Sequence, residues 1–211
     1  MGIAEIAVII VLILSIVLHE VAHGYAANWL GDPTARLAGR LSANPFVHID
    51  PIGSVIIPAM LFMTHSPFLF GWAKPVPYNP YNLSNQRWGE AIVAAAGPLT
   101  NFLLAAIFAG LIRMAGVAGL SESFVDLASQ IVLINVLLGC FNLIPMPPLD
   151  GSKVIEPFLP LRARQQYRAL GAKLEQFGMI GSLLFIIILM QVFGGPFTHL
   201  VYSIAKLLIG A

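Results

Sequence analysis

Long apolar segments constrain this chain more than any other feature of its sequence. A helix needs about 20 consecutive apolar residues to cross the hydrocarbon core of a bilayer. Only 10% of the 211 residues are charged, whereas a soluble domain carries about a quarter. Part of the surface must therefore face lipid. The segments of about spanning length run from Ile3 to Leu30, Ala91 to Met114, Phe124 to Leu143 and Phe177 to Phe193.

Two further apolar segments are shorter. Ile52 to about Met63 is interrupted by Pro58, and Phe197 to Ile209 is amphipathic, so the latter either spans the membrane or lies at its surface. We predict an all-α polytopic membrane protein with five or six transmembrane helices. All of these segments belong to a single integral-membrane domain over residues 1–211.

The polar linkers indicate how the chain crosses the membrane. Lys and Arg gather in residues 31–51 and 145–176, whereas the linker between Met114 and Phe124 carries acidic Glu122. Basic linkers stay in the cytoplasm, so both basic linkers are expected there. Residues 1–18 contain no Lys or Arg, which favours a retained membrane helix over a cleaved signal peptide. Residues 34–42 alternate loosely and are expected to form short β-strands.

A Pro- and Gly-rich stretch interrupts this pattern at Gly71–Pro77. Irregular backbone at membrane depth is tolerated only against protein or a wet cavity. We therefore expect residues 66–80 to form a re-entrant, extended segment that lines the site, with Trp72 and Lys74 near it. An ordinary loop outside the membrane is the alternative.

The first apolar segment contains a metal-binding pattern. Residues His19 to His23 read H-E-V-A-H, and positions i and i+4 share one face of a helix, so two imidazoles can bind one zinc ion. Glu20 lies one step around the helix, where it can serve as general base toward zinc-activated water. Ionisable groups in an apolar helix are costly in a membrane, which favours a functional role over a structural one.

A catalytic zinc site needs a third protein ligand. Asp150 is the main candidate, because three prolines and Gly151 hold the backbone of residues 142–151 rigidly around it. Asp-Gly is also a common turn pair, so an ordinary solvated turn explains these residues equally well.

The two patterns together resemble the site-2 protease family of intramembrane metalloproteases. H-E-V-A-H lies in the first apolar segment, and N-L-I-P-M-P-P-L-D-G follows a later one at residues 142–151. Ala96–Asn101 is similar to the G-P-x-x-N element of that family, and three further stretches resemble its compact bacterial and archaeal members. These stretches are residues 39–45, 48–53 and 71–77, and the resemblance covers about residues 15–155.

The resemblance implies one zinc ion held by His19, His23 and Asp150, with Glu20 as the base. It also implies an endopeptidase that cuts single-pass membrane proteins in or near their transmembrane segments, at the cytoplasmic face of a plasma membrane. The catalytic core would occupy about residues 3–155, with C-terminal helices over about 177–211. We expect neither a PDZ nor a CBS domain in this chain.

Other polar residues have less defined roles. Asn142 is expected either to stabilise an oxyanion or to make an interhelical hydrogen bond. Asn101 is expected to act mainly in packing, and His48, a lone histidine in a linker, is a further candidate for contact with the site.

Three rival classes compete with this interpretation. A catalytically idle protein that binds zinc and a partner helix would have no use for Glu20. A transporter would line a pore, but the polar residues instead form one metal-site pattern. A different membrane zinc protease would use a glutamate as third ligand, from Glu90, Glu122, Glu156 or Glu175.

Partners follow from charge and composition. The net charge is +1, so no basic excess indicates nucleic acid. The expected partners are the lipid bilayer and a membrane-protein substrate, and the sequence does not define an oligomeric state.

Overall fold

The computed structural model describes residues 3–56, 60, 63, 73–176 and 178–210. Within these residues the structure is helical and contains no β-strand. The long helices are α1 (Ile3–Trp29), α4 (Gly89–Arg113), α6 (Glu122–Asn142), α8 (Leu161–Gln176) and α9 (Gly178–Ile209). The short ones are α2 (Thr34–Leu37), η1 (Pro45–His48), η2 (Pro51–Ile56), η3 (Pro80–Asn82), α5 (Ala115–Ala118), α7 (Asp150–Ile155) and η4 (Glu156–Phe158).

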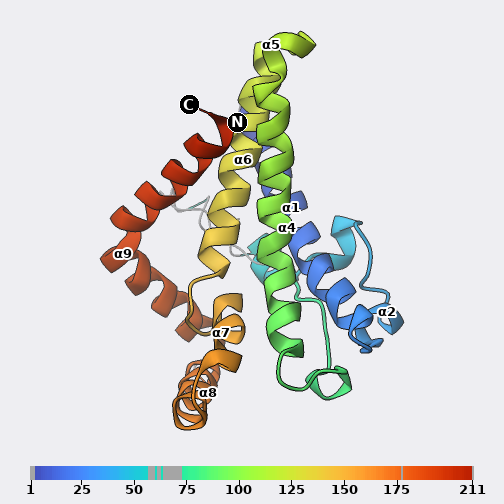
Figure 1. The fold of residues 1–211 in the computed structure, drawn as a ribbon, viewed down its shortest axis with the longest axis vertical. Coiled ribbons are helices and arrows are strands. Elements are labelled where there is room, and N and C mark those ends of the chain that lie inside the picture. Colours follow the sequence, from blue (N-terminus) through green and yellow to red (C-terminus); the bar gives the residue numbers. More distant parts are fainter. Residues whose placement is uncertain (1–2, 57–59, 61–62, 64–72, 177, 211) are drawn as a thin grey trace.

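Four helical stretches among the described residues are long and apolar enough to cross a membrane. They are Ile6–Trp29, Gly89–Arg113, Glu122–Asn142 and Gln191–Ile209. Successive spans run in opposite directions, so that α1 begins and α9 ends at the same end of the bundle (Figure 1). The expectation of a multi-pass, all-α membrane protein is confirmed for these residues.

Helix α4 lies at the centre of the bundle and contacts α1, α6, α7 and α9. At the end remote from α8 its small residues pack closely against α6 and α9. Small residues let helix backbones approach each other, which is how helices associate in lipid, where burial of apolar surface gains little. The buried cluster consists of Ala105, Ala109, Val132, Val136, Val201 and Ala205. Large apolar side chains such as Ile10, Leu103 and Val192 are instead exposed on the outside, as expected for a surface that faces lipid.

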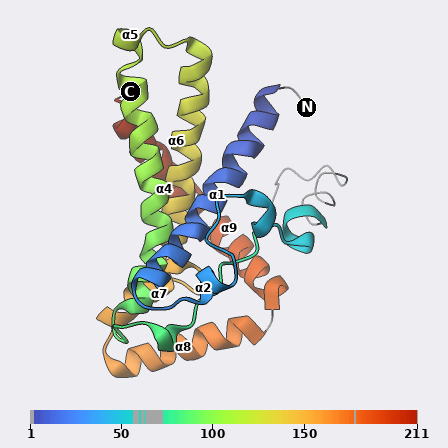
Figure 2. The same cartoon turned by 90° about the vertical axis from the view of Figure 1, so that its right-hand side faces the viewer.

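The opposite end of the bundle carries most of the irregular structure. Helix α8 lies across this end, close to α7, and α2 lies at the same end (Figure 2). Residues 73–79, which form no regular secondary structure, lie at this end as well, and we call them the strap. The basic residues of both predicted cytoplasmic linkers, including Arg36, Arg40 and Lys173, therefore belong to one end of the molecule.

Asp32 joins the strap to the end of α1. Its buried carboxylate accepts hydrogen bonds from the Thr34 backbone N–H and hydroxyl, the Asn79 backbone N–H and the Asn82 amide, at 2.6 to 3.2 Å. Burial opposes ionisation of this carboxyl group, but the donors outweigh it and hold its pKa below the usual range. The strap is thus tied to the helix that carries the histidines.

Two local predictions were wrong. Thr34–Leu37 forms a short helix instead of a strand, with the Leu37 and Ala38 N–H groups bonded to the carbonyls of Pro33 and Thr34. The two predicted C-terminal helices are one continuous helix, α9, which contains Pro196. A proline removes one helical hydrogen bond and bends a helix without necessarily ending it, and α9 bends midway (Figure 1). Residues 73–79 of the predicted re-entrant segment form no regular secondary structure, and residues 66–72 lie outside the described part.

Candidate metal centre

The two histidines of H-E-V-A-H face the same side of α1. Nε2 of His19 lies 3.0 Å from Nε2 of His23, and both side chains are buried. The rings stand nearly perpendicular, at 88°. The i, i+4 spacing thus brings two imidazole nitrogens to one point, as the sequence predicts.

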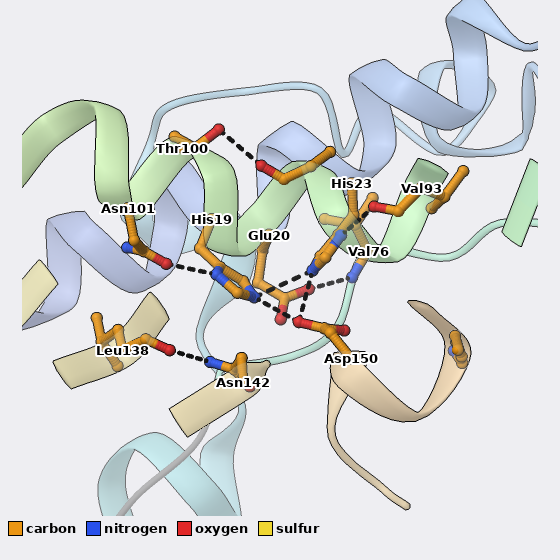
Figure 3. A network of polar contacts seen from close by, with 12 residues as sticks. His19, Glu20, His23, Val76, Val93, Thr100, Asn101, Leu138, Asn142 and Asp150 are labelled. Carbon is orange, nitrogen blue, oxygen red and sulfur yellow. Dashed lines mark hydrogen bonds and ion pairs between the residues drawn. The ribbon is translucent and has the colours of Figure 1, made fainter. Parts of the chain in front are cut away.

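Helix α4 orients both rings from behind (Figure 3). Nδ1 of His23 lies 2.7 Å from the backbone carbonyl oxygen of Val93, and Nδ1 of His19 lies 2.6 Å from Oδ1 of Asn101. An oxygen of either kind can only accept, so each Nδ1 carries the proton, and Nε2 is the nitrogen of each ring that is left to bind a metal. Histidines that bind metals are commonly held in this way.

Asp150 completes the group from the first turn of α7. Its Oδ2 lies 3.1 Å from Nε2 of His19 and 3.3 Å from Nε2 of His23. Asp150 is 131 residues from His19 in the chain. The two distant sequence motifs therefore meet at one place.

The three donor atoms fit a zinc ion. Tetrahedral zinc with bonds of about 2.0–2.1 Å separates its ligand atoms by about 3.3–3.4 Å. The triangle formed by His19 Nε2, His23 Nε2 and Asp150 Oδ2 has edges of 3.0, 3.1 and 3.3 Å. Two imidazoles and one carboxylate would supply the three protein ligands of a catalytic zinc site, in which a fourth position is kept for water.

Gly97 of α4 borders the same space. A Cβ placed there would lie 2.5 Å from Nε2 of His23 and 2.6 Å from Nε2 of His19. Only a glycine lets α4 approach the histidines this closely while leaving room for an ion.

Glu20 turns toward the strap. Its Oε2 accepts a hydrogen bond of 3.0 Å from the backbone N–H of Val76 (Figure 3). The carboxylate borders the same cavity as the two histidines and Asp150 but is not part of the group that could hold a metal. It is thus available to act on a proton.

The site opens into a cavity of about 250 Å³. Its walls come from α1, α4, the strap, the end of α6 and α7. Lys153 and Tyr78 contribute polar groups to these walls, with Lys153 Nζ 3.1 Å from the Tyr78 hydroxyl. The lining residues are His19, Glu20, His23, Pro75, Val76, Tyr78, Val93, Ala94, Asn142, Pro148, Asp150 and Lys153.

The other candidate site residues differ in their position relative to the cavity. Asn142 lines the cavity and donates through Nδ2 to the Leu138 carbonyl at 3.0 Å. Asn101 lies behind His19, fully buried. His48 and Lys74 are not among the described residues that line the cavity: Nε2 of buried His48 donates to the Ser42 carbonyl, and Lys74 is exposed. Trp72 lies outside the described residues.

Two residues, Lys153 and Asn135, were not predicted from the sequence. Lys153 carries no motif of its own, and Asn135 lies within the apolar run of residues 131–141. Val76 and Tyr78 belong to the stretch 66–80 that was expected to line the site, but nothing singled them out individually. Lys153 follows Asp150 by one helical turn, and this spacing was the one available signal that it shares a face with the ligand.

Helices of spanning length around two imidazoles and a carboxylate define a multi-pass membrane protein with a zinc-type metal site. The chain belongs to Peptidase family M50, the family of the site-2 proteases, whose profile matches residues 7–132 and 109–189. It is therefore a zinc metalloprotease, and the family assignment made from the sequence is confirmed.

Several relatives agree with this assignment. YwhC of Bacillus subtilis is 35% identical over 88% of this chain and 81% of its own length. Rip2 of Mycobacterium tuberculosis is 30% identical over 90% of this chain and 69% of its own length. MJ0392 of Methanocaldococcus jannaschii is 27% identical over 71% of this chain and 33% of its own length. All three names contain the words zinc metalloprotease. No solved structure is a significant match to this chain.

Proposed function

We propose that this chain is an intramembrane endopeptidase that hydrolyses peptide bonds in or near the transmembrane segments of single-pass membrane proteins. The observation that carries the proposal is the depth of the metal-ligand group. His19 and His23 lie within the candidate span Ile6–Trp29. At 1.5 Å per residue they stand about 15 and 9 Å along the helix from Trp29, so the site lies below the membrane surface.

The roles of the residues follow from their positions. His19, His23 and Asp150 hold the metal through the three atoms that converge. Zinc, when bound, supplies a Lewis acid that lowers the pKa of water and polarises the scissile carbonyl. Glu20 takes a proton from the attacking water, holds it on its carboxylate and passes it to the leaving amine. The Val76 N–H keeps that carboxylate turned into the cavity.

The walls of the cavity suit an extended substrate. A transmembrane helix hides its carbonyl groups in hydrogen bonds, so the segment to be cut must first unwind. We expect the unwound chain to lie along the strap and to add to it as a strand. Asn142, and Lys153 with Tyr78, place donors on other walls, where a developing negative charge is stabilised. Substrates with Gly, Pro or Asn near the cut are therefore preferred, because these residues weaken helices.

The orientation follows from charge. The basic residues of α2, α8 and the linkers around them lie at the end of the bundle that holds the site, so this end faces the cytoplasm of a plasma membrane. Residues 1–211 act as one integral-membrane domain, with a core over about 3–155 and a C-terminal part over about 177–211.

Bound zinc and cleavage test the proposal together. The purified protein would be reconstituted with a single-pass test substrate, and zinc content and product would be measured for the wild type, Asp150→Ala and Glu20→Gln. We expect about one zinc per chain in the wild type and in Glu20→Gln, little in Asp150→Ala, and cleavage by the wild type alone. Zinc retained by Asp150→Ala would overturn the ligand set. Cleavage retained by Glu20→Gln would overturn the role of the base.

A second experiment tests whether the substrate helix must unwind before cleavage. A helix-breaking Gly-Pro pair placed at the cytoplasmic end of the substrate's transmembrane segment should raise its cleavage several-fold over a Leu-Leu version. Equal cleavage of both would contradict entry by unwinding. An idle zinc-binding protein, the alternative function, would bind the test helix and one zinc but yield no product with either substrate.

A further inference from the structure

We propose that Asn135 of α6 is a positioning residue that sets the tautomer of His19 through Asn101. Asn135 is not among the described residues that line the cavity, and no motif includes it. The inference rests on the proposed ligand set, because it concerns which nitrogen of His19 faces the metal.

A backbone carbonyl fixes the orientation of the Asn135 amide. Nδ2 of Asn135 lies 2.9 Å from the carbonyl oxygen of Ile131, one turn back on α6. A carbonyl oxygen can only accept, so the NH₂ group of Asn135 must point toward it. The same Nδ2 donates to the hydroxyl of Ser15 on α1 at 3.0 Å. Oδ1 of Asn135 is therefore left to face α4.

The orientation of Asn135 determines that of Asn101, which contacts His19. Its Nδ2 donates to Oδ1 of Asn135 at 2.9 Å, which turns its own Oδ1 toward Nδ1 of His19, at 2.6 Å. An amide oxygen can only accept, so Nδ1 of His19 must carry the proton. Nε2 of the neutral ring is then left to bind the metal beside Asp150.

Burial fixes the orientation of the Asn101 and Asn135 amides. Asn101 and Asn135 are each 0% exposed and Ser15 is 4% exposed, so water does not compete for these groups. A flipped amide would place two donors or two acceptors face to face in a low-dielectric interior, where an unpaired polar group is costly.

The two histidines differ in this respect. His23 is held by the carbonyl of Val93, a group that has no alternative orientation. His19 is held by a side-chain amide, which offers either an acceptor or a donor depending on how it is turned. Only His19 therefore depends on a further residue, Asn135, which fixes how the amide of Asn101 is turned.

Zinc affinity tests this role without reliance on catalysis. Wild-type protein, Asn135→Leu and Asn135→Thr would be compared in detergent by competition with a zinc chelator. The Thr hydroxyl can still bond the Ile131 carbonyl, which keeps the helix intact, but it does not reach Asn101. We expect both variants to bind zinc about tenfold more weakly, the lower end of the range for such supporting residues.

Ser15→Ala is the matched control. It removes a buried hydrogen bond from the same network but leaves Asn135 oriented by Ile131, so it should lower thermal stability while zinc affinity stays within about twofold of the wild type. A purely structural network would instead make zinc affinity follow stability in all three variants.

The tautomer itself is visible by NMR of zinc-loaded protein labelled with ¹⁵N-histidine. His19 should show a protonated Nδ1 and a zinc-bound Nε2 in the wild type and in Ser15→Ala, and a weakened or lost Nδ1 proton signal in Asn135→Thr. A folded Asn135→Thr with unchanged tautomer and unchanged zinc affinity would overturn the inference. If instead the proposed ligand set were wrong, Asp150→Ala would still bind zinc.

Discussion

A Cβ added to Gly97 would stand 2.5 Å from Nε2 of His23, in the space that a bound ion needs. The backbone of α4 thus forms one wall of the metal site, and position 97 has no room for a side chain larger than the hydrogen of glycine.

Gly97→Ala should therefore reduce zinc affinity by at least about tenfold and reduce cleavage in proportion, because the methyl group displaces the histidine rings. Bound zinc in the purified protein measures the effect. Gly110→Ala is the control on the same helix, since a Cβ there meets no described atom within 4 Å. Equal zinc content in the two variants would contradict this account of the site.

The strap should matter for catalysis but not for metal binding. Val76→Pro removes the N–H that holds Glu20, whereas Val76→Ala keeps it. We expect Val76→Pro to retain zinc and lose about tenfold or more in kcat, part of the roughly 10²–10⁴-fold that general-base catalysis contributes, because the carboxylate is kept but no longer held in place. Val76→Ala should lose much less. A similar kcat in both variants would show that the backbone donor has no part in orienting the base.

Asp32 should stabilise the fold in a pH-dependent way. Replacement by Asn leaves buried donors without a charged acceptor and should cost about 2 kcal/mol at neutral pH. The folded pKa lies below the ordinary value of 3.8, so this contribution is complete above that value and is lost as pH falls through the folded pKa. The Tm difference between wild type and Asp32→Asn, measured in detergent, should thus be constant from pH 7 to pH 5 and shrink in stronger acid.

Asp126→Asn provides the comparison for that experiment, because Asp126 is an exposed residue at the start of α6. The Tm of Asp126→Asn should match that of the wild type at every pH tested. A difference for Asp32→Asn that grows toward low pH would reverse the expected sign and disprove the linkage.

The orientation in the membrane can be measured by labelling. In a Cys140→Ser background, Asp126→Cys and Lys173→Cys place single thiols at opposite ends of the bundle. On intact cells a membrane-impermeant maleimide should label the first thiol, and it should label the second only after permeabilisation. The reverse pattern would move the site to the outer face of the membrane.

Local periodicity explains what the sequence analysis could predict. The apolar segments, the shared face of His19 and His23, and the position of Glu20 depend on residues within one helix, whose geometry repeats every 3.6 residues. Asp150 was already less certain, since its motif suited a turn as well as a ligand, and only the family resemblance favoured the metal. The strand at residues 34–42 was wrong because a loose alternation over so few residues does not separate a strand from a helical turn.

Tertiary packing decided the rest. The sequence by itself determined that this is a membrane protein with an H-E-x-x-H metal site, because hydrophobic length and helical spacing are properties of single segments. It did not determine that Asn101 and Asn135 orient His19, that Asp32 ties down the strap, or that Val76 holds Glu20. It also did not show that His48 and Lys74 lie away from the described walls of the cavity. Each of these contacts joins residues distant in the chain, and those of Asn101 and Asn135 depend on how α4 packs between α1 and α6.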